Sequence, residues 1–123
     1  MPPSFLGGIG RVEKRPRTWP EFVEFYRSCG PAYEPIRSLI DYISISRHAS
    51  SVHPRLLMGC TLLYRSPTYD TRDGVLWIQS FPPRNVLQFL YTTSEHISDA
   101  PCWSCLPDDG IQAFERFVTD HQW

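Results

Sequence analysis

The chain has 123 residues, which is enough for one domain with a hydrophobic core that needs no disulfide or metal to hold it. Its 41% hydrophobic and 20% charged residues are ordinary for a globular protein and exclude a disordered or fibrous one. The formal net charge of −1 excludes a whole-molecule field that would attract nucleic acid or a membrane.

The first 17 residues combine proline, glycine and the basic run RVEKRPR. They predict a flexible basic arm, followed by a single domain over residues 18–123. The N-terminal apolar stretch has no basic lead and is too short for a signal peptide, and the longest apolar run, 56–64, is half of a membrane span. We therefore expect a cytoplasmic protein with no membrane segment and with its four cysteines reduced.

Two helices are predicted before residue 50. The first starts at Thr18, because Thr18 and Glu21 form a capping box ahead of an apolar stripe with helical spacing, and the Gly-Pro pair at 30–31 ends it. The second runs from Pro35 to about Ser46, since proline is favoured at a first helical position. Its tail, YISIS, also suits the start of a strand.

Three strands are expected next, in the segments LLMGCTLLYR, VLWIQSF and VLQFLYTT. Residues 93–107 look irregular, and a third helix is predicted to start at Asp108 or Asp109, where Asp109 and Gln112 fit a capping pair. The order is α-α-β-β-β-α. It predicts a two-layer α+β fold, a three-stranded antiparallel meander with helices on one face.

Side chains alternate across a strand, so the meander has two faces of different character. One set, which includes Leu87 and Phe89, is almost wholly apolar and is expected to face the helices. The other set is mixed, and either binds a partner or is half covered by the N-terminal arm or by a second copy in a homodimer. A register slip of one residue would exchange the two sets. The predicted partner-binding residues are Thr61, Arg65, Trp77, Gln79 and Gln88.

The motif Cys102-Trp-Ser-Cys105 is the one spacing pattern with chemical meaning. A redox pair places its first thiol at a helix N-terminus, but here the helix follows the pair, after two carboxylates that raise a thiol pKa. A zinc site needs four ligands, so His121, His96 or Cys60 would have to complete the set. The prediction is no cofactor, with Cys102, Cys105 and His121 as the metal candidates to check.

No GxSxG, P-loop or GxGxxG motif is present in the sequence. The favoured hypothesis is therefore a non-catalytic protein-binding module, most concretely a bacterial immunity-type protein that binds and neutralises a partner toxin through the mixed sheet face. One alternative is a small enzyme or thiol/metal protein that uses Cys102 and Cys105 with His96. Another is a nucleic-acid-associated protein that stacks bases on Trp77, which the near-neutral charge disfavours.

Overall fold

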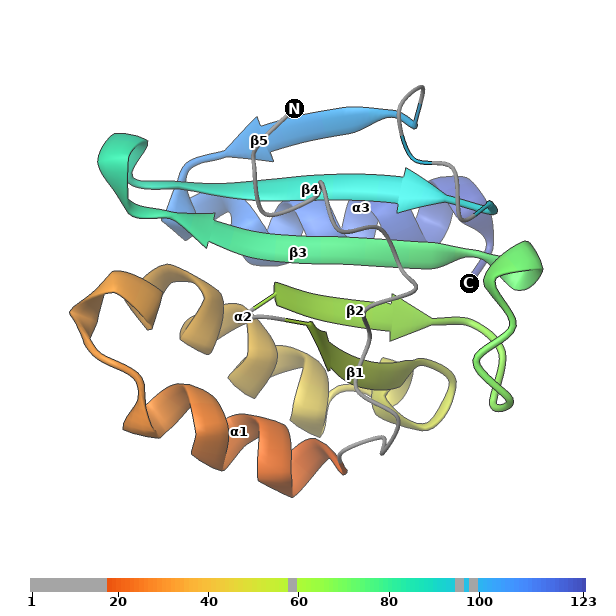
Figure 1. Cartoon of the computed structure of the whole chain (residues 1–123), viewed down its shortest axis with the longest axis horizontal. Helices are drawn as coiled ribbons and strands as arrows, with labels where there is room; N and C mark the ends of the chain where they lie inside the picture. The colour runs from red at the N-terminus through yellow and green to blue at the C-terminus, as the bar shows by residue number, and fades with distance from the viewer. Residues whose placement is uncertain (1–17, 58–59, 95–96, 98–99) are drawn as a thin grey trace.

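The computed structural model describes residues 18–57, 60–94, 97 and 100–123, and these form an α+β fold (Figure 1). The predicted basic arm over residues 1–17 lies outside the described residues, as does His96. In the described part of the chain, no helix combines the length and the apolar character needed to cross a membrane. The helices and strands, in chain order, are α1 Trp19–Ser28, α2 Glu34–Ile45, β1 His53–Leu57, β2 Cys60–Tyr64, β3 Val75–Phe81, β4 Val86–Thr92, β5 Cys102–Cys105 and α3 Gly110–His121.

The sheet is an antiparallel meander of five strands in the order β1-β2-β3-β4-β5 (Figure 1). The predicted three-stranded meander is therefore incomplete. The expected first strand is in fact two strands, with Leu57 paired to Cys60. The segment Cys102–Cys105, predicted to be irregular, is the edge strand β5. Apolar alternation alone does not separate one long strand from two short ones, and the overlooked signal was the glycine at position 59.

The break between β1 and β2 changes which side chains of β2 face the helices. For β3 and β4 the predicted faces are confirmed, since Leu76, Ile78 and Phe89 pack in the helix-side cluster. For β2 they are exchanged: Leu63 lies on the helix side, and Leu62 lies on the opposite side. The reason is the period of two along a strand, because a boundary in the wrong place shifts every later residue to the other face.

The side-chain caps predicted at the starts of α1 and α3 have different outcomes. The predicted cap of α1 at Thr18 is confirmed, because the Glu21 amide donates to Thr18 Oγ1 at 3.4 Å. The other half of the predicted capping box differs, since the Glu21 carboxylate accepts from the Thr18 hydroxyl at 3.2 Å. The predicted cap of α3 is wrong, since no side chain caps that helix at Asp109. A 3₁₀ turn over Pro107–Asp109 gives Asp109 φ −97° and ψ 1°, whereas a capping residue needs an extended backbone.

The three helices pack on one face of the sheet, and α3 runs behind the strands in Figure 1. Their apolar stripes meet the apolar sheet residues in one cluster that includes Phe22, Ile40 and Phe114. A second buried cluster lies on the opposite face of the sheet. It contains Leu57, Leu62, Tyr64, Val75, Trp77, Leu90 and Ile97. The sheet is therefore buried on both faces, whereas the sequence left open whether the mixed face is covered or binds a partner.

Candidate functional site

Trp77, the centre of the predicted binding surface, lies on the expected face of β3 but is 0% exposed. It packs with Leu62 and Leu90, so it is part of the core and is not available to a partner in this arrangement. Gln79 is also buried; its amide donates to Gln88 Oε1 at 2.5 Å, and its Oε1 accepts from the Cys60 thiol at 3.2 Å. These two glutamines satisfy each other, as buried polar side chains generally do.

Thr61 and Arg65 lie away from that face. Thr61 is buried beneath the helices, where its hydroxyl is 2.8 Å from that of Tyr26. Arg65 follows β2 and donates to the backbone carbonyl of Gln122, just beyond α3, at 3.2 Å. The structure therefore does not bring the five predicted binding residues together on one accessible surface. Thr61 misses that surface because of the exchanged faces of β2.

Cys102 and Cys105 lie on opposite faces of β5, because residues three apart in a strand point to opposite sides. Cys102 is opposite Leu90, and Cys105 is opposite Leu87 on the helix side. Burial, with a smaller contribution from the charge of Asp109, raises the pKa of the Cys105 thiol. Within the described residues, no group of three or more potential metal ligands comes together, and His121 instead packs against Tyr91 and Phe117.

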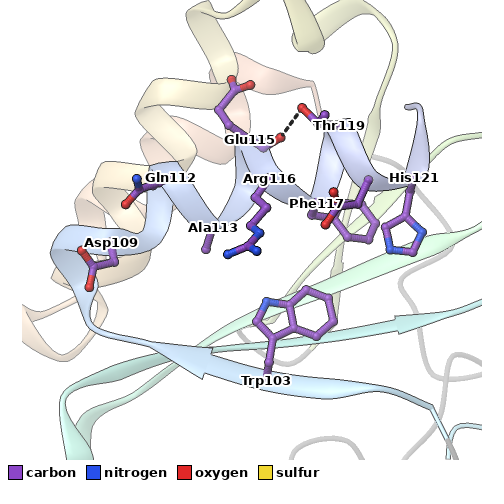
Figure 2. A pocket seen from close by; sticks show the side chains of 10 residues that line it. Trp103, Asp109, Gln112, Ala113, Glu115, Arg116, Phe117, Thr119 and His121 are labelled. Carbon is purple, nitrogen blue, oxygen red and sulfur yellow. Dashed lines mark hydrogen bonds between the residues drawn. The ribbon is translucent and has the colours of Figure 1, made fainter.

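An accessible groove of about 950 Å³ lies between α3 and the edge strand β5 (Figure 2). We call it the α3–β5 groove. Trp103 rises from β5 toward α3, Arg116 extends from α3 above it, and Asp109 and His121 lie at the two ends. The lining residues are Trp103, Asp109, Gln112, Ala113, Glu115, Arg116, Phe117, Thr119, Asp120 and His121.

The floor of the groove is a stack of aromatic rings. Trp103 lies parallel to Phe89, with ring centroids 5.6 Å apart and an interplanar angle of 5°. Trp103 also stacks on Phe117 of α3, at 6.1 Å and 24°. Trp103 is only half-buried, whereas Phe89 and Phe117 are buried. The exposed part of the indole is therefore held in one orientation by rings that belong to the core.

Carboxylates dominate the charge around this floor. Asp109 and Asp120 are exposed near opposite ends of α3, and exposed Arg116 lies between them in sequence. Glu115 points to the far side of the helix, where Tyr42 Oη donates to it at 2.5 Å and His48 Nε2 lies 3.1 Å from both carboxylate oxygens. The groove thus presents two exposed carboxylates and one guanidinium to an incoming molecule.

The Glu115 contacts predict an acid-sensitive stability. Hydrogen bonding from Tyr42, followed by that from His48, holds the pKa of Glu115 below its ordinary value, and Arg47 contributes in the same direction. The unfolded chain therefore takes up this proton at a higher pH than the folded chain does. The resulting stabilisation is present above about pH 4.3 and is lost as the pH falls through the lowered pKa.

We expect Glu115→Gln to flatten the decline in unfolding free energy between neutral and acidic pH, measured by urea denaturation. Glu24→Gln, at an exposed position on α1, controls for the loss of one carboxyl group. If the unfolding free energy of Glu115→Gln falls with acid as steeply as that of the wild type, Glu115 is not the source of the acid sensitivity.

The sequence did not predict the α3–β5 groove, because it did not predict β5. A signal was present: Trp103 and Cys105 alternate with polar Ser104, which is typical of a half-buried strand. The short length of the segment and the prolines at 101 and 107 hid it. In a four-residue strand, pairing with β4 decides the conformation more than local preference does.

The fold and this groove define a small α+β protein with a half-buried tryptophan, Trp103, at the edge of its sheet. No known protein family matches the chain, and no curated protein or solved structure is significantly similar to it.

Proposed function

We propose that this chain is a non-catalytic module that binds another protein, and that the α3–β5 groove is the surface it uses. The observation that carries the proposal is the half-buried Trp103, stacked on two core rings beside the exposed Arg116. Tryptophan and arginine are the side chains most enriched among residues that dominate binding energy in protein interfaces.

The geometry of Trp103 supports this proposal on energetic grounds. Binding costs free energy whenever a mobile side chain has to be immobilised at the interface. Phe89 and Phe117 already fix the indole, so little ordering remains when a partner covers it. The surrounding polar residues of α3, such as Gln112 and Thr119, supply the hydrated rim that surrounds the apolar centre of such interfaces.

The charges of the groove favour a partner with a basic contact surface. Asp109 and Asp120 would attract such a surface and would repel the phosphates of a nucleic acid. The most concrete form of the proposal is an immunity-type protein that neutralises a partner toxin. A toxin inhibitor must cover one particular surface by shape and charge, and it needs no reactive group of its own.

The proposal is tested with the product of the adjoining reading frame, co-expressed with this chain and titrated by calorimetry. Asp120→Lys should weaken the complex by about tenfold, because it places a like charge against a basic surface. Lysine in the last turn of α3 also suits the helix dipole, so the fold should survive. Asp73→Lys, at an exposed position beyond the groove, is the charge-matched control.

Equal affinity of wild type, Asp120→Lys and Asp73→Lys would place the contact elsewhere on the molecule. Absence of a complex with the adjoining product would remove the immunity form of the proposal. If the complex does form, a toxicity assay in cells that express both proteins then separates neutralisation from simple binding.

A further inference from the structure

The strand β5 is an edge of the sheet (Figure 1), and its residue Trp103 lines the α3–β5 groove (Figure 2). Among the described residues it pairs with β4 alone. An edge strand exposes a row of backbone donors and acceptors that can pair with another chain. A chain that paired here would enter the groove assigned to the partner protein, so a role for this edge rests on the proposed function.

The pairing pattern shows which backbone groups of β5 face outward. The amide of Tyr91 donates to the carbonyl of Pro101 at 3.1 Å. In an antiparallel pair, residues alternate between those that bond to the neighbouring strand and those that point away. Trp103 and Cys105 therefore bond to β4, whereas Cys102 and Ser104 direct their N–H and C=O groups toward the open edge.

The outward groups lie on exposed residues. Cys102 and Ser104 are both exposed, and the half-buried Trp103 between them points to the helix side. A strand added at this edge would place alternate side chains on the same side as Trp103, over the groove of about 950 Å³. Its backbone would meet the donors and acceptors of Cys102 and Ser104. The edge and the groove thus form one site, in which the edge supplies backbone bonds and the groove receives side chains.

We infer that β5 accepts an extended, basic segment of the partner protein as an additional strand of the sheet. The basic character follows from Asp109 and Asp120, the exposed carboxylates near the two ends of α3. The side chains of the added segment that point toward Trp103 are apolar, and its residues near the two ends of the groove are lysine or arginine. Arg116 donates to carbonyl oxygens of the segment that β5 leaves without a partner.

A second copy of this chain is the competing occupant, and the charges disfavour it. Pairing of β5 with β5 around a two-fold axis brings the same surface of both copies together. The carboxylates Asp109 and Asp120 of one copy would then approach those of the other. Like charges across an interface cost free energy, whereas a basic segment meets no such repulsion.

The test uses the full chain and a phage-displayed library of random linear peptides of about nine residues, the length of a long strand. We expect the selected peptides to alternate apolar and polar residues and to carry net positive charge. Their affinities are then measured by calorimetry with synthetic peptides. Ser104→Pro should weaken binding by at least about tenfold, because it removes an outward N–H without touching the bonds to β4.

Ser104→Ala is the matched control and should leave the affinity within about threefold of wild type, a difference of less than 1 kcal/mol. A second experiment needs no protein variant: N-methylation of alternate peptide amides should abolish binding in one phase of the alternation and preserve it in the other. Selection of acidic peptides, or of none, would overturn the inference. So would N-methylation that is harmless in both phases.

The outcomes separate this inference from the proposed function. If Asp120→Lys weakens the complex with the partner protein and Ser104→Pro does not, the groove binds a folded surface and strand addition is wrong. A wild-type chain that sediments as a dimer, and as a monomer after Ser104→Pro, would assign the edge to a second copy.

Discussion

Trp77→Ala is expected to lower the free energy of unfolding by about 3–5 kcal/mol, as truncation of a large buried aromatic residue generally does. The side chain is 0% exposed and packs among Leu62, Val75 and Leu90. Removing it leaves a cavity that the central strand of a five-stranded sheet cannot close, because β2 and β4 hold β3 on both sides. Urea denaturation monitored by far-ultraviolet circular dichroism measures the change.

Trp77→Phe is the matched control, since it keeps an aromatic ring in the same cluster and should cost clearly less. The sequence placed Trp77 on a partner-facing surface, where the alanine variant would fold normally and lose affinity. A loss of less than about 1 kcal/mol would favour that surface assignment, because substitutions at exposed positions are usually nearly neutral.

Phe89→Ala should also cost about 3–5 kcal/mol, and it should disturb the α3–β5 groove in addition. Phe89 is 1% exposed, and its ring is the layer on which Trp103 stacks. Its loss therefore removes core contacts and frees the indole that the proposed partner covers. The unfolding free energy and the near-ultraviolet circular dichroism of the tryptophans measure the two effects separately.

Phe89→Leu controls for burial alone, because a change between large apolar side chains usually costs less than about 1.5 kcal/mol. It should lower stability slightly and still loosen Trp103, since leucine offers no ring for stacking. An alanine variant with wild-type stability would show that β4 turns its other face to the helices.

Much of the helical part of the fold was predictable, because its signals are local. The capping residue Thr18 sets the start of α1, and the helical spacing of Ile36, Ile40 and Ile43 identifies the buried side of α2. These signals act within one or two turns of backbone, so the residues around them are sufficient to predict the outcome. The assignment of Leu76, Ile78 and Phe89 to the helix side of the sheet succeeded for a similar reason, since alternation within one unbroken strand is local.

The candidate site was less predictable, because each part of it depends on a partner strand. β5 is a strand because β4 pairs with it, and the face of Thr61 follows from the position at which β2 begins. Trp77 is buried because other residues cover the second face of the sheet. The alternation of side chains along one strand does not predict whether such a cover exists.

By itself the sequence determined the α+β class, the three helices and most of the residues that form their buried stripes; Ile111 of α3, predicted to be buried, is 39% exposed. Only the tertiary structure decided that Trp77 belongs to the core and that Trp103 lines an accessible groove. The physical reason is that the sequence pattern of a hydrophobic strand is the same whether its outer face is covered by a second layer or exposed to solvent. Which rings remain exposed is decided by strand pairing between residues far apart in the chain.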